Sequence, residues 1–532
     1  MVDIEDMDVE MIMVNKRNDE RPKANVVRGV RSIWAGRALG DSFIPGNSVC
    51  SLKVYISTWG CSHNNSDSEY MAGLLSSAGY AVTSQCDEAD VWILNSCTVK
   101  TPSEHHLRNM VTNGTEKSKK IIVAGCVSQA QPNIAWLNNV SLLGVHNIDR
   151  IVEVLEETAQ GNVVQLLSRR ASRAGLSRNV PLLLPKIRRN PLVELLPISS
   201  GCLNKCTYCK TKQARGNLVS YSIEEIVARA KTAFQEGVKE IWLTSEDLGA
   251  YGRDIDETLP DLLNELVAVI PNGCMLRLGM TNPPYILDYL EEIAKILRHP
   301  RVYSFLHIPV QSGSDAVLRE MRREYSVDDF RVVVDFMQKN VPDISIATDV
   351  ICGFPTETDE DFSQTIKLID QYKFPTVFIN QFYPRPGTKA ASMKLLPTEI
   401  VKQRTKMLTT LFHSYQPYAN RAGRVYKVLV AEKAFRGDYL VGHNKAYEQV
   451  LLPNVPTLMG KEVQVRVTNS SKHSMMGEVI EKDQWQIICY LKSLSSTISQ
   501  NGKHLFIIFC LAYFYTLLRV YLLTEGKVQN IN

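Results

Sequence analysis

Short apolar runs alternate with amphipathic stretches over most of the chain. Between residues 51 and 167 the runs LKVYIST, VWILN and KIIVAG are each followed by helical periodicity, at about 66–78, at about 103–118 and from about Gln129. Strands that alternate with helices in this way are typical of a parallel sheet covered by helices. The pattern therefore predicts an N-terminal parallel α/β domain over residues 51–167.

The same alternation resumes at residue 192 and continues to residue 415. Six strands are expected, in the runs LVELLPI, EIWLT, MLRLGM, VYSFLHI, ISIATDVI and TVFINQF, with helical segments such as IEEIVARAKTAFQEG between them. Consecutive βα units with right-handed crossovers curl into a barrel. Six units predict an incomplete (βα)6 barrel.

The pattern changes again over residues 416–481. The runs RVYKVLVAEK, YEQVLLP and KEVQVRVTN are expected to form short strands, and Gly, Asn and Pro separate them. About five such strands predict a small antiparallel β-barrel, a module that often binds single-stranded nucleic acid. A β-sandwich with a buried core and no ligand is the alternative.

The two ends of the chain differ from everything between them. Residues 1–50 lack periodicity and are predicted to be a flexible N-terminus. In the tail, residues 482–532, the run LFIIFCLAYFYTLLRVYLL occupies 505–523, close to the ~20 apolar residues that span a bilayer. A C-terminal transmembrane anchor is therefore predicted, and an atypical C-terminus with no membrane role is the alternative.

Residues 168–191 form a basic linker without a single acidic residue. Clustered arginines with no nearby acids are an electrostatic footprint of nucleic-acid binding. A solvated linker is the equally plausible alternative. The RNA-binding candidates are Arg169, Arg170, Arg188 and Arg189.

Composition narrows the class of protein. With 532 residues, 45% hydrophobic and 22% charged, the chain is expected to be a globular protein of several domains, which excludes general disorder and a multi-span membrane protein. A net charge of +4 is too small to indicate a partner. Residues 1–20 lack the pattern of a secretory signal, so a reducing compartment is expected, and the 12 cysteines are predicted to be metal ligands or buried thiols.

The strongest chemical signal is GCLNKCTYC, which places Cys202, Cys206 and Cys209 directly after the first barrel strand. Cysteine thiolates hold iron–sulfur clusters, ordinarily four of them. Since no fourth cysteine is nearby, the spacing predicts a [4Fe–4S] cluster with one iron open to a substrate or cofactor. A structural zinc site is the main alternative, but it would need a fourth Cys or His close by.

A second group of cysteines is scattered in sequence. Cys61, Cys97 and Cys126 each follow one of the three apolar strands of the N-terminal domain. The carboxyl ends of neighbouring parallel strands lie along one edge of a sheet, where ligands bind. The three thiols are therefore predicted to meet at a second metal site, and coincidence among many cysteines is the alternative.

The loops after the other barrel strands are polar and rich in turn residues, as in TSED, TNPP, HIPVQS and CGFPTE. In βα barrels these loops carry the active site. We expect them to share a cavity with the Cys202–Cys209 loop. Glu246 is a candidate to bind the amino group or the ribose of a cofactor.

These segments together resemble the methylthiotransferases of the radical S-adenosylmethionine class over roughly residues 52–481. The resemblance is carried by TWGCSHNNSDSEYMAG, LNSCTVK, AGCVSQAQP, GCLNKCTYCKTKQARG, WLTSEDLGAYGRD, HIPVQSGSD, ICGFPTET and NQFYPRPGT. GCSHNNSD and TSEDLGAYGRD are similar to the eukaryotic and archaeal branch. One departure is GFPTET, where the family usually has GFPGET; Thr356 adds a Cβ where glycine can take a positive φ.

The resemblance implies a specific chemistry. Cys202, Cys206 and Cys209 would hold the radical [4Fe–4S] cluster that cleaves S-adenosylmethionine, and Tyr208 would pack near the adenine of that cofactor. Cys61, Cys97 and Cys126 would hold an auxiliary [4Fe–4S] cluster that handles the incoming sulfur. Such an enzyme needs an electron donor and a sulfur source.

The implied substrate is a tRNA anticodon stem-loop, bound with the help of a C-terminal TRAM barrel. The branch converts N6-threonylcarbamoyladenosine at position 37 to its 2-methylthio derivative. Animal members end in a hydrophobic endoplasmic-reticulum anchor; without one, a cytosolic location is expected. A methylthiotransferase for isopentenyladenosine or a protein side chain is one alternative, and a non-catalytic iron–sulfur protein that binds RNA or transfers electrons is another.

Overall fold

The structure is a computed structural model that describes residues 52–98, 101–167 and 179–480. The predicted N-terminal segment 1–50 and the predicted anchor at 505–523 lie outside these ranges. Within the described ranges, no helix combines the length and apolar character needed to cross a membrane.

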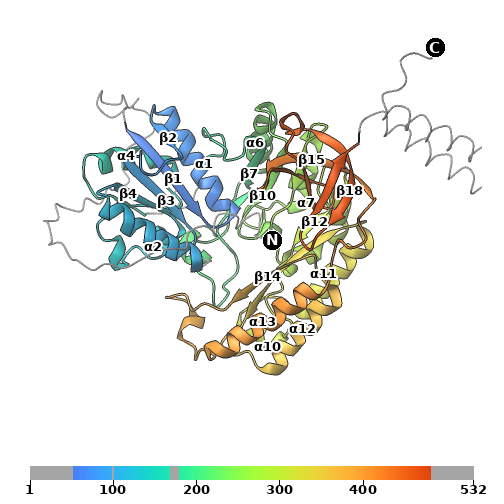
Figure 1. Cartoon of the computed structure of the whole chain (residues 1–532). Coiled ribbons are helices and arrows are strands. Elements are labelled where there is room, and N and C mark those ends of the chain that lie inside the picture. The colour runs from blue at the N-terminus through green and yellow to red at the C-terminus, as the bar shows by residue number, and fades with distance from the viewer. Residues whose placement is uncertain (1–51, 99–100, 168–178, 481–532) are drawn as a thin grey trace, which may run out of the picture.

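The N-terminal part is a six-stranded parallel sheet with helices on both faces (Figure 1). Helices α1 and α4 cover one face, and α2 covers the other. The predicted parallel α/β architecture is confirmed, although the short outer strands were not predicted. The strands run in the order β2-β1-β3-β4-β5-β6, with bounds β1 Lys53–Trp59, β2 Ala81–Thr83, β3 Val91–Ser96, β4 Lys120–Gly125, β5 Ser141–Gly144 and β6 Gln165–Leu166. The helices are α1 Ser62–Ser77, α2 Thr101–Glu116, α3 Cys126–Ala130 and α4 Ile151–Ala159.

The middle of the chain forms the predicted incomplete barrel. Two three-stranded parallel sheets, β7-β10-β11 and β12-β13-β14, are joined by isolated bridges such as Met280–His307. The strands are β7 Val193–Pro197, β10 Glu240–Thr244, β11 Met275–Arg277, β12 Phe305–His307, β13 Ser345–Cys352 and β14 Thr376–Gln381. The longer helices are α6 Ile223–Gln235, α7 Leu259–Val269, α9 Leu290–Arg298, α11 Val327–Asn340, α12 Asp359–Tyr372 and α13 Thr398–Ser414.

Shorter elements complete the barrel loops: β8 Ser199–Ser200, α5 Thr211–Arg215, β9 Val219–Ser220, α8 Pro283–Ile286 and α10 Asp315–Glu320. Helices α6, α11 and α12 each begin with a capping box, in which a Ser or Thr and the acid three residues later bond each other's backbone amides. These caps fix where each helix leaves the end of its strand.

The C-terminal part is a closed five-stranded barrel in the order β15-β16-β17-β19-β18. Its strands are β15 Val425–Lys433, β16 Tyr439–His443, β17 Gln449–Pro453, β18 Glu462–Ser470 and β19 Met475–Val479. The predicted strand number is confirmed. The pairing is antiparallel as expected, except that β17 and β19 close the barrel in parallel.

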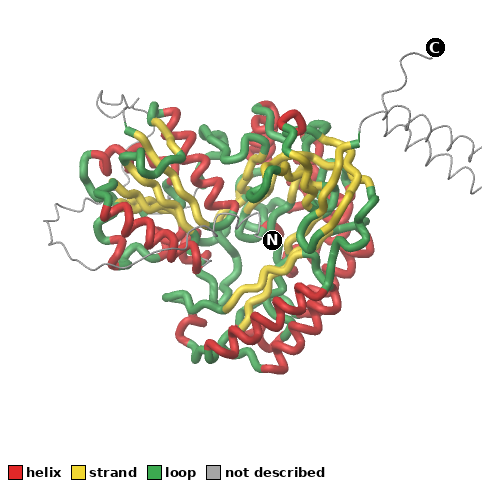
Figure 2. Tube along the Cα trace, in the orientation of Figure 1, coloured by secondary structure: helices red, strands yellow, loops and turns green. Residues whose placement is uncertain are grey.

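The C-terminal barrel, at the upper right of Figures 1 and 2, packs against the strand starts of the larger one. Tyr447 enters the larger barrel where its strands begin, packing edge-to-face against Tyr303 with ring centroids 4.9 Å apart. The Arg277 guanidinium lies 4.7 Å from the Tyr447 ring centroid, a cation–π contact. This packing closes the end of the barrel opposite the Cys202–Cys209 loop.

The loop GFPTET adopts its turn without strain at Thr356. Gly353 has the left-handed φ of 79°, whereas Thr356 is exposed and does not have a positive φ. The Glu357 carboxylate accepts a bond from the Gly353 amide at 2.9 Å and one from Arg404 at 2.7 Å. Thr356 therefore does not adopt the positive φ that glycine could take in this loop.

Candidate active site

The structure brings Cys61, Cys97 and Cys126 together at one edge of the N-terminal sheet. Strand register is the reason: the last residue of β1 pairs with the last residue of β3, which in turn pairs with the last residue of β4. Each cysteine follows one of these aligned ends. We call these three cysteines the auxiliary trio.

A polar cradle supports the auxiliary trio. The Cys61 thiol donates to Asn64 Oδ1 at 3.3 Å, while Asn64 Nδ2 lies 3.9 Å from the Cys126 sulfur. Asn95 fixes that amide: Asn64 Nδ2 donates to Asn95 Oδ1 at 3.1 Å, and Asn95 Nδ2 donates to the Asn64 carbonyl at 2.9 Å. Sequence reasoning had not assigned a role to Asn64, although it lies in the GCSHNNSD motif.

Two of the three thiols, Cys61 and Cys126, differ in acidity. A hydrogen bond from Cys97 lowers the pKa of Cys61 to about 6, against the opposing effect of burial, with help from Arg215 and His63. Burial raises the pKa of Cys126 to about 11. Metal ligation requires thiolates, so Cys61 is prepared for it, and a bound metal would deprotonate the others.

Gly60 sets how closely β1 approaches Cys97. Its φ is 140°, and an added Cβ would lie 2.4 Å from the Cys97 Cβ. We expect Gly60→Ala to displace Cys97 and to lower the iron content by about half, because one of two four-iron clusters would be lost. Iron and sulfide analysis of anaerobically purified protein measures this. Gly161→Ala, with nothing within 4 Å of the added Cβ, is the matched control, and equal losses in both variants would contradict the expectation.

The second set of cysteines, Cys202, Cys206 and Cys209, lies in the loop after β7 and is here called the radical loop. Neighbouring elements hold its backbone: the Cys202 amide donates to the Gly216 carbonyl at 3.2 Å, and the Thr207 amide donates to the Met321 carbonyl at 3.0 Å. The Thr211 amide donates to the Cys209 sulfur at 3.4 Å. The loop is thus shaped by the protein fold itself.

Two charged residues beside the radical loop were not singled out from the sequence. Arg323 Nη1 donates to the Cys206 sulfur at 3.3 Å and also bonds the side chain of Asn282. Asp247 accepts two bonds from Asn282, and burial raises its pKa to about 6. Asp247 lies in the TSED loop that the sequence placed near the site, whereas Arg323 follows helix α10, outside the loops singled out from the sequence. Only the structure shows that both face the cysteines.

Tyr208 lies within the radical loop, as expected, and is buried against Phe354 with ring centroids 6.5 Å apart. Its backbone carbonyl accepts a bond from Arg385 at 3.2 Å, which ties the radical loop to the segment after β14.

Both cysteine sets fit iron–sulfur clusters by the chemistry of their donors. Each provides three soft thiols, largely buried, and each lies beside an arginine, Arg215 or Arg323, that favours thiolates. Among the described residues, no three His, Cys, Asp or Glu side chains are close enough to hold a single metal ion. A four-iron cluster is larger than an ion and takes ligands that stand further apart.

Comparison with known proteins identifies the family of this chain. Family models match at three places: the Radical SAM superfamily over residues 196–369, the uncharacterized protein family UPF0004 over 53–141, and the TRAM domain over 420–480. The Homo sapiens threonylcarbamoyladenosine tRNA methylthiotransferase is 59% identical over 461 residues, which are 87% of this chain and 78% of that protein. The chain belongs to this family.

Another member of the threonylcarbamoyladenosine tRNA methylthiotransferase family is the probable enzyme of Pyrococcus horikoshii, 36% identical over 81% of this chain and 100% of that protein. Among solved structures, a radical S-adenosylmethionine methyltransferase from Kitasatospora setae aligns with a TM-score of 0.47 and 13% identity, covering 64% of this chain and 77% of that one. Family membership confirms the predicted enzyme class, a radical S-adenosylmethionine sulfur-group transferase, and the predicted cofactors, two [4Fe–4S] clusters and S-adenosylmethionine.

Glu246, the candidate cofactor ligand of this methylthiotransferase, faces the N-terminal sheet. Its Oε1 lies 3.0 Å from His63 Nδ1 and 3.2 Å from Arg215 Nε. Burial alone would raise the pKa of Glu246, but His63 and Arg215 more than offset this effect and lower it. The carboxylate acts electrostatically on Cys126, whereas Asp247 acts on Cys202.

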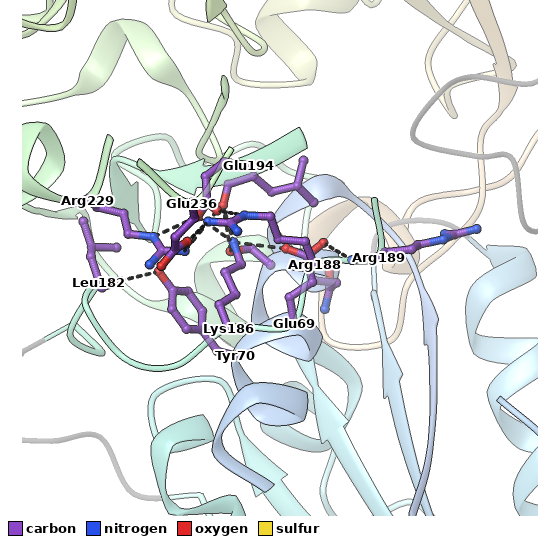
Figure 3. Close-up of polar contacts among 12 residues, drawn as sticks. Glu69, Tyr70, Leu182, Lys186, Arg188, Arg189, Glu194, Arg229 and Glu236 are labelled. Carbon is purple, nitrogen blue, oxygen red and sulfur yellow. Dashed lines mark hydrogen bonds and ion pairs between the residues drawn. The ribbon is translucent and has the colours of Figure 1, made fainter. Parts of the chain in front are cut away.

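The four RNA-binding candidates have different surroundings. Arg169 and Arg170 lie outside the described residues. Arg188 is mostly buried and ion-paired with Glu194 and Glu236 (Figure 3), so its guanidinium is engaged in a structural network. Arg189 donates its backbone amide to Glu69 at 3.0 Å, and its side chain points away from the network in Figure 3.

The acids that the linker lacks in sequence are supplied by other elements. Lys186 Nζ lies 3.1 Å from Glu69 of α1 and 3.1 Å from Glu194 of β7. Burial alone would raise the pKa of Glu194, but Lys186 and two arginines lower it to about 2. The linker thereby fastens the N-terminal sheet to the barrel (Figure 3).

Removing the Lys186 ammonium is expected to destabilise the enzyme strongly. Lys186→Met leaves buried carboxylates with too few cations, a change that costs about 3–5 kcal/mol of unfolding free energy. The midpoint of thermal unfolding measures this. Lys53→Met removes an exposed pair with Glu88 and should cost at most about 1 kcal/mol, so equal shifts would argue against a buried network.

Proposed function

We propose that this chain transfers a methylthio group to C2 of N6-threonylcarbamoyladenosine at position 37 of tRNA. The observation that carries the proposal is the presence of two separate cysteine trios at adjoining strand ends. Ala214, five residues beyond the last cysteine of the radical loop, packs against Cys126 of the auxiliary trio. The two cysteine sites therefore adjoin across the boundary between sheet and barrel.

This geometry supports the assignment of the cluster ligands. The auxiliary trio would hold one [4Fe–4S] cluster and the radical loop the other, each leaving one iron without a cysteine. When bound, the clusters and S-adenosylmethionine supply the methylthio group and the radical that removes the hydrogen from C2, a carbon with no acidic proton. The protein contributes buried thiols, the Asn64 cradle and the Arg323 contact, which orient the cofactors.

The tRNA would contact the mouth of the larger barrel and, at that barrel's other end, the C-terminal barrel, which matches the TRAM domain. Unstacked bases of an anticodon loop are accessible to a protein, and the target adenine must reach the barrel mouth. The curated relatives are named for the same nucleoside in tRNA, which supports this substrate over isopentenyladenosine or a protein side chain.

Mass spectrometry of tRNA nucleosides tests the proposal. Cells that lack the chain should lose 2-methylthio-N6-threonylcarbamoyladenosine and retain its precursor, and the full chain should restore the product. An unchanged level of the product would refute the proposal. Loss of the isopentenyl methylthio nucleoside instead would assign the alternative substrate.

Membrane attachment and the accessory donors belong to the proposal as well. We propose that residues 505–523 anchor the enzyme to the endoplasmic reticulum membrane, on the strength of their apolar sequence. Fractionation of the full chain against a chain that ends at Glu481 tests this: both in the soluble fraction would refute it. The electron donor and the sulfur source are separate partners that the chemistry requires.

A further inference from the structure

Arg215 is the last residue of α5 and joins the two halves of the active site. Its side chain is only 3% exposed. Nη2 donates to Asp67 Oδ2 at 2.6 Å, and Nε lies 3.2 Å from Glu246 Oε1. Asp67 belongs to α1, which packs on the N-terminal sheet, and Glu246 belongs to the loop after β10 of the barrel. One guanidinium therefore bridges the two domains.

The same guanidinium lies within electrostatic range of the auxiliary trio. Arg215 acts electrostatically on both Cys61 and Cys126, and the preceding residue, Ala214, packs on Cys126. His63, one residue into α1, approaches Glu246 at 3.0 Å from the other side. We call His63, Asp67, Arg215 and Glu246 the junction cluster.

The path of the chain explains why this position matters. Only five residues separate Cys209 of the radical loop from Arg215. The Cys202 amide is bonded to the carbonyl of Gly216, the residue after Arg215, at 3.2 Å. The segment that starts at Cys209 of the radical loop therefore ends beside Cys126 of the auxiliary trio.

We propose that Arg215 is a positioning residue of the auxiliary cluster, whose reduction potential it raises and whose place relative to the radical loop it holds through Asp67 and Glu246. The proposal rests on the cluster assignment of the proposed function. A cation buried next to a cluster stabilises the reduced form, which carries one more negative charge, and a low local dielectric strengthens this effect. The two carboxylates of the junction cluster act in the opposite direction, and they also hold the guanidinium in place.

Redox titration of the auxiliary cluster alone tests the inference. The parent is the full chain with Cys202, Cys206 and Cys209 changed to Ala, reconstituted anaerobically and followed by electron paramagnetic resonance. Arg215→Gln should make the midpoint potential more negative, and Arg215→Lys should restore most of it. Asp67→Asn and Glu246→Gln should each make the potential more positive.

Arg229→Gln is the matched control. The Arg229 side chain is also 3% exposed. It pairs with Glu194 at 3.0 Å, the carboxylate that also pairs with Lys186 of the linker, and it contacts neither cysteine site. A purely structural role would lower stability in both arginine variants. We expect the midpoint potential of the auxiliary cluster to change only in Arg215→Gln.

Each outcome has a distinct meaning. An unchanged potential in an Arg215→Gln protein that retains about four irons would overturn the inference and leave the proposed function intact. If Arg215→Gln does not fold, unchanged potentials in Asp67→Asn and Glu246→Gln would overturn it equally. A parent that binds no iron would overturn the cluster assignment, and the inference with it.

Discussion

Replacing Cys202 by alanine is expected to abolish formation of the methylthio nucleoside and to reduce iron from about eight to about four per chain. The radical loop has three thiols and no fourth cysteine nearby, so the loss of one leaves a pair that cannot hold a cubane with an open iron. Release of 5′-deoxyadenosine from S-adenosylmethionine should fall to background as well.

Cys352→Ala is the matched control for Cys202→Ala. Cys352 is another cysteine at a barrel strand end, but it is fully buried, and burial raises the pKa of its thiol. Iron content and product formation should be unchanged in that variant. Equal iron in both variants would remove the radical loop from the list of cluster ligands.

The auxiliary trio could be predicted from sequence because parallel register is a simple rule. Cys61, Cys97 and Cys126 each follow an apolar strand, and those strands are neighbours in the sheet. The ends then align without any further information. The same rule accounts for the predicted barrel and for the position of the radical loop at its open end.

The start of α1 could not be predicted by the same reasoning. The helix begins at Ser62, four residues earlier than its periodicity indicates, because its first turn is polar and yet buried. His63 contacts Glu246 of the barrel and Asn64 contacts the cysteine site, and these polar residues leave no apolar stripe in the sequence. Function in this first turn hides the usual amphipathic signal.

The sequence also does not indicate which charged residues pair with each other. The linker contains no acid in sequence, yet Lys186 and Arg188 pair with acids from α1, β7 and the segment after α6. Arg215 and Asp67 likewise find each other only once sheet and barrel are packed together. Local composition gives the sign of a segment's charge, but tertiary packing determines where that charge is neutralised.

Cys61→Ala is expected to separate the two halves of the reaction. The methylthio product should be lost and about four irons should remain, because the auxiliary trio loses one of its three ligands, the thiol whose pKa is about 6, while the radical loop is untouched. Reductive release of 5′-deoxyadenosine should persist, in contrast to Cys202→Ala. Cys86→Ala, a half-buried thiol outside both sites, should retain product and iron alike. A Cys61→Ala enzyme that still formed product would mean that sulfur is delivered without the auxiliary trio, because no other described cysteine lies at that sheet edge to replace it.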